Sequence, residues 1–285
     1  MSNKVIAIIV DGMRYDKACE ALGFIQHLVE TNQAALYKVK SELPSLSRPL
    51  YEVLLTGTPA SVNGITSNQA VRLSTEKSLF HLTKENGLRN GTVSYYWVSE
   101  LYNRAPFHFI EDREQEDGSK PIQYGKFYWD DDYPDSHVLM DAEALRRKYD
   151  PHFLYIHPLG VDVKGEIFGS ESKEYREQIL KMGSLLAQLL PIWIKEGYHI
   201  LITSDHGMSE TGNHGGITDG ERDVPLFIMS PKVEPGVYNE VVPQLAFAPL
   251  VCELLNIEPS NKMISYQFPG LKGKNTLKGR YNISK

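Results

Sequence analysis

The sequence predicts an α/β fold in which helices flank both faces of a mainly parallel central sheet. Two observations favour this class. Short apolar segments rich in β-branched residues alternate along the chain with segments of helical period, which is typical of parallel sheets. The 285-residue chain is also 41% hydrophobic and 23% charged, as expected of a globular protein that buries one large core.

Five segments are predicted as strands because they are short and apolar: residues 5–10, 92–98, 153–156, 199–203 and 224–229. The first of them, VIAIIV, has no polar residue at all. A run without polar alternation is typical of a strand that is buried on both faces.

Helical periods separate these strands. Apolar residues recur through residues 18–28, and the apolar segment 50–55 ends at a Thr-Gly-Thr-Pro stop. The clearest period has intervals of three and four residues: Tyr175, Ile179, Met182, Leu186, Leu189 and Trp193. Residues 246–255 are predicted as a late helix.

Residues 95–133 do not fit this alternation. The segment is aromatic and polar, and a charged run at residues 111–120 interrupts it. We expect it to be a small inserted lid over the edge of the sheet that contributes to specificity. Residues 1–285 would then form a single catalytic domain.

The net charge of -6 argues against a nucleic-acid polymer or an anionic membrane as the main partner, since both bind basic surfaces. The apolar run at residues 5–10 is too short for a signal sequence core or a membrane span. We therefore expect a cytoplasmic protein with no membrane span. Cys19 and Cys252 lie beside apolar residues and are expected to be buried, reduced thiols.

Acidic and histidine residues follow three of the predicted strands. Because the carboxyl ends of parallel strands meet at one edge of the sheet, six side chains are expected to converge there: Asp11, Asp162, Glu166, Asp205, His206 and His214. Carboxylates packed so closely repel one another unless a cation neutralises them. Carboxylate and imidazole ligands suit Zn, Mn or Fe, and six residues are enough for two divalent ions.

Each of these residues also has an ordinary structural explanation. An Asp after a strand is most often a turn or cap residue, a single His is usually a satisfied core or surface residue, and Glu166 could simply be solvated. The metal-site hypothesis therefore depends on the joint placement of the six residues.

Ser47 is the candidate nucleophile because it lies just before the apolar helix at residues 50–55. A hydroxyl in this position is normally a helix N-cap. The same position suits catalysis, since a helix N-terminus attracts phosphate and a bound metal ion lowers the pKa of a hydroxyl.

Four motifs occur in order: Asp11-Gly12, SLSRPLYEVLLTGTP at 45–59, HPLGVD at 157–162 and TSDHGMSETGNHGG at 203–216. Together they resemble the alkaline phosphatase superfamily. More closely, they resemble its type I phosphodiesterase/nucleotide pyrophosphatase branch and the related catalytic domains of phosphoethanolamine transferases. The resemblance implies an alkaline phosphatase-like core that uses two divalent metal ions, with Zn as the usual metal.

The resemblance also implies a role for each site residue. One ion would be held by Asp11, Ser47, Asp205 and His206, and the other by Asp162, Glu166 and His214. The implied enzyme is a phosphodiesterase in which metal-activated Ser47 attacks phosphorus and water then hydrolyses the phosphoseryl intermediate.

Two residues depart from the family pattern. Glu166 stands where the family usually has His, which either favours Mn or Fe relative to Zn or marks a weakened second site. Leu50 stands where nucleotide pyrophosphatases tend to have an Asn that contacts phosphate. Either Arg48 or a backbone N–H makes that contact here, or the substrate is bound differently.

Other functions share the same core. A sulfatase is disfavoured because Tyr51 replaces the Arg of the sulfatase motif, and a phosphoglycerate mutase is disfavoured because the insertion is too small. A phosphonate hydrolase and a phosphomonoesterase stay open, so the predicted substrate is a small-molecule phosphate ester or phosphonate. A non-catalytic, metal-stabilised binding protein is the alternative from another class, with Glu166 marking a decayed site.

Aromatic residues of segment 95–133 are the candidates for specificity. Tyr96, Trp97 and Trp129, together with Phe107 and Tyr124, are predicted to stack on a base or to cover an apolar leaving group. The same residues could instead form a small satellite core.

Overall fold

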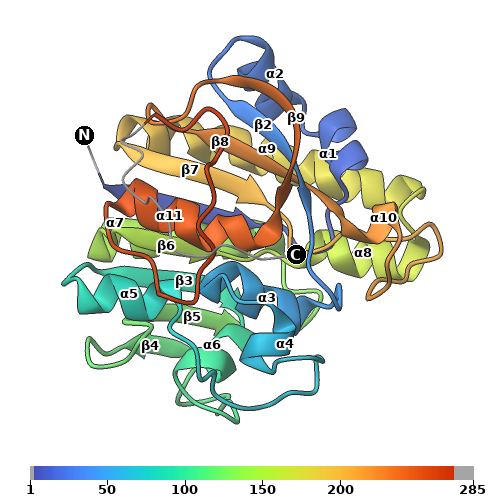
Figure 1. The fold of residues 1–285 in the computed structure, drawn as a ribbon. Coiled ribbons are helices and arrows are strands. Elements are labelled where there is room, and N and C mark those ends of the chain that lie inside the picture. The colour runs from blue at the N-terminus through green and yellow to red at the C-terminus, as the bar shows by residue number, and fades with distance from the viewer. Residues whose placement is uncertain (1–2, 273–285) are drawn as a thin grey trace, which may run out of the picture.

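The computed structural model describes residues 3–272. Within them, one sheet has nine strands in the order β4-β5-β3-β6-β1-β7-β8-β2-β9 (Figure 1). The strands are β1 (Lys4–Ile9), β2 (Ala35–Lys40), β3 (Asn90–Tyr95), β4 (Glu114–Glu116), β5 (Tyr124–Tyr128), β6 (Phe153–Ile156), β7 (Tyr198–Thr203), β8 (Asp223–Met229) and β9 (Gly236–Pro243).

The helices that cover this sheet follow the predicted alternation with strands. In chain order they are α1 (Tyr15–Ala21), α2 (Gly23–Glu30), α3 (Ser47–Thr56), α4 (Ala60–Asn63), α5 (Leu79–Glu85), α6 (Trp97–Tyr102), α7 (Asp135–Tyr149), α8 (Gly160–Phe168), α9 (Lys173–Lys195), α10 (Asp219–Arg222), η1 (Gln244–Ala246) and α11 (Phe247–Leu255).

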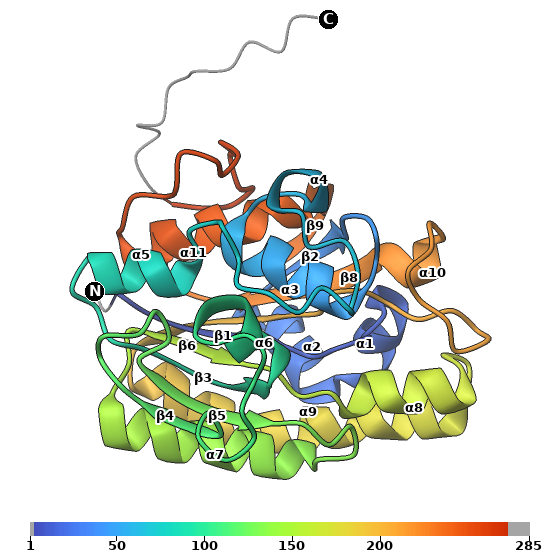
Figure 2. The same cartoon turned by 90° about the horizontal axis from the view of Figure 1, so that it is seen from below.

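The centre of the sheet is parallel, because β5, β3, β6, β1 and β7 pair in the same direction. β8 pairs antiparallel with both β7 and β2, and β4 pairs antiparallel with β5. Helices lie on both faces, with α3, α5 and α11 on one and α1, α2, α7 and α9 on the other (Figure 2). The predicted fold class is therefore confirmed.

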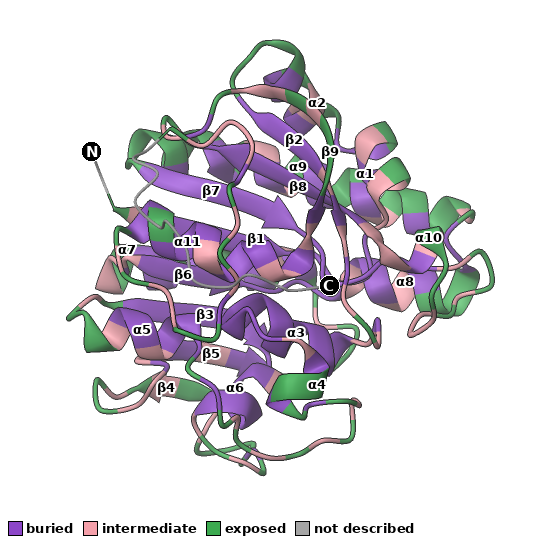
Figure 3. Cartoon of the chain, in the orientation of Figure 1, coloured by how far each residue is buried: buried purple, intermediate pink, exposed green. Residues whose placement is uncertain are grey.

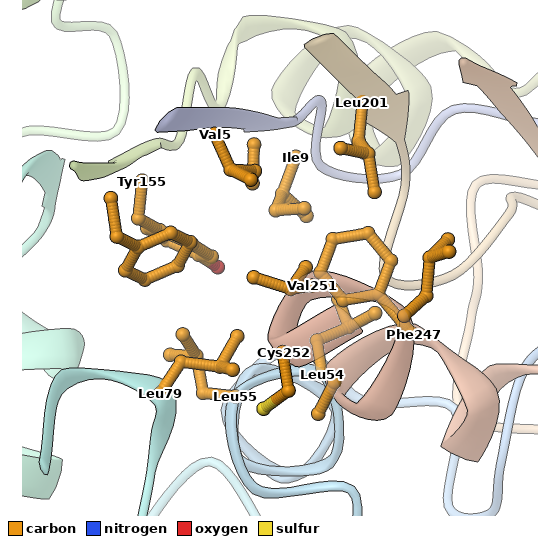
Figure 4. Packing of buried hydrophobic residues seen from close by; sticks show 14 of the residues in the cluster. Val5, Ile9, Leu54, Leu55, Leu79, Tyr155, Leu201, Phe247, Val251 and Cys252 are labelled. Atoms are coloured by element: carbon orange, nitrogen blue, oxygen red, sulfur yellow. The ribbon is translucent and has the colours of Figure 1, made fainter. Parts of the chain in front are cut away.

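Two apolar clusters fill the space between the sheet and its two helical layers (Figure 3). The strands β1, β3, β6, β7 and β8 are buried almost throughout, whereas the edge strands β4 and β9 are largely exposed. The cluster beneath α3 and α11 includes Val5, Ile9, Leu54, Leu55, Leu79, Tyr155, Leu201, Phe247, Val251 and Cys252 (Figure 4). Because every residue of α3 is buried, the position of that helix is fixed from all sides. Both cysteines are unpaired; Cys252 is buried as predicted, whereas Cys19 is partly exposed.

The segment 95–133 differs in part from the prediction. Strand β3 ends at Tyr95, and Trp97 begins helix α6, where the sequence predicted strand to residue 98. β5 pairs with β3, so the end of the segment extends the sheet and does not only cover its edge. The aromatic composition of β5 explains this, since aromatic residues favour the pleated, half-buried surface of a strand. A role of this segment in specificity stays a prediction.

Two strands were not predicted, and two helices were predicted as one. Strands β2 and β9 pair beside β8 and carry polar residues between apolar ones, which hides them from a search for continuous apolar runs. The predicted helix at residues 18–28 is two helices, because α1 ends at Ala21 and α2 begins at Gly23. Among residues 3–272, no helix combines the length and apolar character of a membrane span.

Candidate metal centre

The predicted site residues of three strands meet at one edge of the sheet. In the register of the sheet, Ile8 of β1 lies beside Ile156 of β6 and Ile202 of β7, so the three strands end at the same level. The loops that follow carry Asp11, His157 and Asp205. Ligand-bearing loops therefore leave the carboxyl edge of the sheet side by side, as open parallel sheets arrange them.

The first group of candidate ligands consists of Asp11, Asp205 and His206, whose ligand atoms lie within 4.8 Å of one another. All three residues are completely buried. His206 Nε2 lies 3.3 Å from Asp11 Oδ1 and 3.4 Å from Asp205 Oδ2. Neither of these carboxylate oxygens has a hydrogen-bond partner among the described residues. Buried carboxylate oxygens without a partner are costly, so this convergence fits a bound cation.

Asp11 is held in place through its other oxygen. Oδ2 accepts a hydrogen bond from the Tyr51 hydroxyl and one from His157 Nε2 at 3.0 Å. The Nε2 atom of His157 must carry the proton, because a carboxylate can only accept. Burial would raise the pKa of Asp11, but the His157 hydrogen bond and the charge of His206 lower it to about 2. Asp11 is therefore an anion whose Oδ1 is directed into the site.

Asp205 is fixed in the same way, with one oxygen occupied and one left for the site. Its Oδ1 accepts the N–H of Gly12 at 3.2 Å and the hydroxyl of Ser204 at 3.3 Å. Burial and the charge of Asp11 raise the pKa of Asp205 well above its usual range. Gly12 has a φ of +69°, and a Cβ at this position would lie 2.5 Å from Asp162 Oδ1. Only glycine fits at this position, where the loop after β1 lies against the carboxylates of Asp162 and Asp205.

His206 presents one nitrogen to the site because the other is engaged. Its Nδ1–H donates to the carbonyl of Gly207 at 2.8 Å, which leaves the lone pair on Nε2. Burial and the nearby His214 lower the pKa of His206 to about 3. The neutral imidazole is therefore suited to ligate a metal ion, and a backbone carbonyl orients it in the usual manner of such ligands.

The second group of candidate ligands consists of Asp162, His206 and His214. Asp162 Oδ1 is buried and has no hydrogen-bond partner among residues 3–272, and burial raises its pKa well above the usual range. His214 donates Nδ1–H to the Ser45 carbonyl at 3.1 Å, and its ring stacks on His206 with centroids 4.0 Å apart. His206 was predicted as a ligand of the first ion alone, but its ring belongs to both groups of candidate ligands.

Glu166 lies at the exposed side of this second group. His214 Nε2 is 3.1 Å from Glu166 Oε1 and 4.0 Å from Asp162 Oδ1. The Glu166 side chain is 53% exposed, whereas that of Asp162 is 7% exposed. Burial lowers the pKa of His214, but the hydrogen bond to Glu166, the charge of Asp11 and the hydrogen bond to the Ser45 carbonyl together raise it. Glu166 is thus placed where a third ligand of the second ion would lie.

The fit of this site to divalent metal ions is supported by its chemistry. Three buried carboxylate oxygens without partners, on Asp11, Asp162 and Asp205, face two neutral or partly neutral imidazoles. Oxygen and nitrogen donors in this mixture suit Zn, Mn and Fe. Five of the six residues predicted from the sequence form two groups that share His206, and Glu166 lies beside the second group.

Ser47 is the first residue of α3 and is 5% exposed. It does not cap the helix: the N-cap residue is Leu46, and no side-chain cap is formed. Its Oγ lies 3.1 Å from His206 Nε2. Since Nδ1 of His206 carries the proton, the Ser47 hydroxyl donates to Nε2. The candidate nucleophile is therefore hydrogen-bonded to the imidazole nitrogen that lies beside the free oxygens of Asp11 and Asp205.

Arg48 does not share the direction of Ser47. Successive residues of a helix project about 100° apart, and the Arg48 guanidinium lies on Glu100, with Nη2 2.7 Å from Oε2. Its exposure of 1% leaves no solvent-facing contact for a phosphate. Leu50, at the position where the family pattern suggested an Asn, is completely buried in the core.

A different amide lies beside the nucleophile. Asn68 Oδ1 accepts the backbone N–H of Arg48 at 3.0 Å, which places this side chain at the N-terminus of α3. Pro49 has no N–H, so the first turn of α3 offers fewer backbone donors than a typical helix. Asn68 was missed because its loop is 21 positions from Ser47 and only the fold brings the two together.

His157 and Tyr51 were also not predicted as site residues, although both hold Asp11. The spacing of Tyr51 does carry a signal: it lies four residues after Ser47, and residues four apart share one face of a helix. His157 directly follows β6 at the level where Asp11 follows β1, so the expected sheet edge also points to it.

One of the aromatic candidates, Trp97, lies next to the nucleophile helix. Trp97 lies 6.3 Å from Tyr51 and 4.6 Å from the Arg48 guanidinium, measured to ring centroids. Tyr96, Trp97 and Trp129 are all partly exposed. Tyr124 instead stacks on Tyr149 at 4.0 Å, within the layer of α7.

Comparison with known families is consistent with this geometry. Residues 5–222 match the family model described as type I phosphodiesterase / nucleotide pyrophosphatase. The catalytic subunit of human GPI ethanolamine phosphate transferase 2 is 25% identical over 288 residues, covering 95% of this chain and 28% of that protein. The chain thus spans less than a third of the length of this relative.

Solved structures share the fold. Murine ectonucleotide pyrophosphatase / phosphodiesterase 5, as an inactive mutant in complex with AMP, superimposes with a TM-score of 0.71 at 13% identity over 90% of this chain and 96% of that chain. A mutant of the alkaline phosphatase PafA superimposes with a TM-score of 0.69 at 11% identity, covering 95% of this chain and 99% of that one. The core is therefore alkaline phosphatase-like.

Proposed function

Because the chain belongs to the type I phosphodiesterase/nucleotide pyrophosphatase family, we propose that it is a metal-dependent enzyme that cleaves a phosphate diester with Ser47 as the nucleophile. One observation carries this proposal. Ser47 begins a fully buried helix, and its hydroxyl lies 3.1 Å from His206 Nε2, the nitrogen beside the Asp11 and Asp205 oxygens that have no hydrogen-bond partner.

The residues of the chain divide the chemistry as follows. Asp11, Asp205 and His206 would hold one divalent ion and Asp162, Glu166 and His214 the other. When bound, the ions would supply positive charge that neutralises the phosphate oxygens and lowers the pKa of a neighbouring hydroxyl. The buried helix α3 holds the Ser47 oxygen in one orientation, so it can approach phosphorus in line with the leaving oxygen.

Two bonds change in each of two steps. The bond from Ser47 Oγ to phosphorus forms as the bond to the leaving alcohol breaks, and the Ser47 proton passes to the surrounding solvent or leaving oxygen. In the second step, the oxygen of a water or alcohol attacks phosphorus as the bond to Ser47 Oγ breaks, and the proton of the acceptor passes to solvent or to the departing Ser47 oxygen. Asn68, at the N-terminus of α3, is placed to orient a phosphate oxygen through its amide N–H.

The acceptor in the second step distinguishes two candidate functions. With water, the protein is a phosphodiesterase or nucleotide pyrophosphatase; with an alcohol, it is a transferase. The similarity to GPI ethanolamine phosphate transferases supports the second candidate and makes a phosphoethanolamine diester a substrate worth testing. The same Ser47 chemistry serves both, as it does a monoester or phosphonate substrate.

Hydrolysis of bis-p-nitrophenyl phosphate, with Zn²⁺ or Mn²⁺ supplied in turn, tests the proposal. We expect turnover that Ser47→Ala lowers at least about 10³-fold, since nucleophilic catalysis is lost. Ser61→Ala, on the exposed surface of α4, is the matched control and should retain wild-type turnover. Turnover that survives Ser47→Ala would overturn the proposal. A parallel panel of monoester, phosphonate and diester, with and without an added alcohol, separates the candidates.

A further inference from the structure

A buried polar bridge joins the nucleophile helix α3 to helix α6. Arg48 and Glu100 form an ion pair in which both side chains are almost completely buried, with 1% and 4% exposure. One turn further along α3, Glu52 accepts the hydroxyl of Tyr102 at 2.6 Å. Buried ion pairs are rarely retained for stability alone, because apolar replacements of similar volume are often as stable. We therefore looked for a function of this ion pair beyond stability.

Arg48 makes its contacts through both the edge and the face of its guanidinium. The edge donates to Glu100 Oε2 at 2.7 Å, and the face lies over the indole of Trp97 at 4.6 Å. A planar guanidinium suits this combination of an ion pair and stacking, which a lysine ammonium cannot reproduce. Because Arg48 directly follows Ser47 in α3, these contacts fix the orientation of Trp97 relative to Ser47.

Glu100 extends the bridge to the loop that follows α6. Its second oxygen, Oε1, accepts the backbone N–H of Phe107 at 2.9 Å. Phe107 contacts Tyr96 and Phe109, and Phe109 contacts Trp129, at ring centroid distances of 5.2 to 5.5 Å. These rings, together with Trp97, form what we call the aromatic wall: Tyr96, Trp97, Phe107, Phe109 and Trp129.

Part of the aromatic wall is exposed to solvent. Phe109 is 49% exposed and its neighbour Ile110 is 86% exposed, while Tyr96, Trp97 and Trp129 are partly exposed. The wall adjoins the site through Trp97, which contacts Tyr51, the residue that donates to Asp11. A substrate bound at Ser47 would therefore have aromatic surface beside it.

We infer that Arg48 is a positioning residue that holds the aromatic wall against the nucleophile helix, and that the wall binds an apolar or aromatic group on the phosphate ester. This inference rests on the proposed function for its substrate, but its binding component does not require turnover. It replaces the expectation that Arg48 contacts phosphate, since the guanidinium is occupied by Glu100 and Trp97.

The variant Arg48→Met would leave Glu100 buried without a partner, and this can unfold the protein. The double variant Arg48→Met/Glu100→Gln removes both charges, and the new amide can still accept the N–H of Phe107. Arg48→Lys keeps the charge but loses the stacking. Lys77→Met, at an exposed ion pair far from the bridge, is the control for loss of a surface cation.

Two pairs of probes test the inference. The first pair, methyl p-nitrophenyl phosphate and phenyl p-nitrophenyl phosphate, has the same leaving group. We expect the double variant to raise KM for the phenyl ester about tenfold, the size of a lost aromatic contact, and to leave kcat and the methyl ester within about twofold. The second pair, methylphosphonate and phenylphosphonate, is measured by calorimetric binding, and the double variant should lose the preference for phenyl.

Two results would overturn the inference. An equal loss of kcat on both esters, restored by Arg48→Lys, would show that the charge of Arg48 acts on phosphate. An unchanged preference for phenyl groups in both measurements would show that the bridge does not position the wall. If the wild type cleaves neither ester but prefers phenylphosphonate, the proposed function fails while the inference holds.

Discussion

The two halves of the candidate metal centre differ in how firmly their ligands are held. In the first half, Asp11, Asp205 and His206 are completely buried, and each has one polar atom fixed by a neighbour and one directed into the site. In the second half, Glu166 is 53% exposed. His214 lies in a loop with glycines on both sides of it.

This difference indicates that the two ions would have different roles. The first half is pre-organised, so it suits the ion that positions and activates Ser47. The second half can adjust its ligands, and its exposed carboxylate is the variable part of the site. We therefore expect catalysis to depend most on the first half and metal identity to depend most on the second.

The largest effect is expected from Asp11→Asn. The amide keeps the size of the side chain but removes the charge that faces His206, so the first ion would be lost or bound weakly. We expect kcat to fall about 10³-fold in a diester assay. A loss smaller than that of Glu166→Gln would contradict the ranking of the two halves.

A smaller effect is expected from His157→Phe, which keeps a ring in place but removes the hydrogen bond to Asp11 Oδ2. Second-layer partners of metal ligands are typically worth about 10–100-fold in metal affinity or activity. Metal affinity by competition with a chelator is the measurement. His81→Phe, on α5 outside the site, serves as the comparison variant. An equal change of metal affinity in both variants would show that the effect comes from altered packing and not from the lost hydrogen bond to Asp11.

A still smaller effect is expected from Glu166. We expect Glu166→Gln to reduce turnover about tenfold, because Asp162 and His214 remain as ligands. Glu166→His should shift the preferred activating metal from Mn²⁺ toward Zn²⁺, since imidazole is the softer donor. Reactivation of the metal-free enzyme with each ion measures the shift. An identical order of metals in wild type and Glu166→His would show that Glu166 does not ligate.

The two halves should also separate on acidification. In the first half the pKa of Asp205 is raised, but the pKa values of Asp11 and His206 are lowered to about 2 and about 3. In the second half the pKa values of both Asp162 and His214 are raised. Protons compete with metal only once the pH falls to the pKa of a ligand. As the pH falls from 8 to 5, two ligands of the second half but only one of the first become protonated, so the second ion should leave before the first. Metal analysis after dialysis checks this; simultaneous loss of both ions would contradict it.

The sequence allowed much of the site to be predicted, for a physical reason. Parallel strands end at a common edge, so Asp11, Asp162 and Asp205 could be grouped from their positions after apolar runs. Tyr51 was within reach of the same reasoning because it lies one helical turn from Ser47. Arg48 was predicted to contact phosphate, whereas its guanidinium pairs with Glu100, because adjacency to Ser47 in sequence does not give a common direction on a helix.

The parts that could not be predicted depend on contacts between distant segments. Asn68 reaches Arg48 only through the fold of a loop, and the Glu100 partner of Arg48 lies 52 positions away. Likewise, Tyr124–Tyr128 pairs with β3 as a strand of the sheet, and its sequence does not specify a partner. In these cases the local sequence pattern does not indicate the partner, which is determined by the packing of distant segments.

The most direct test of the account is to trap the intermediate on Ser47. The protein is mixed with an excess of diester substrate, quenched in acid within milliseconds and digested, and the peptide that contains residue 47 is examined by mass spectrometry. The account predicts a substrate-derived phosphoryl group on Ser47 that is absent after metal chelation. Steady turnover without any label on this peptide, or a label on another residue, would contradict it.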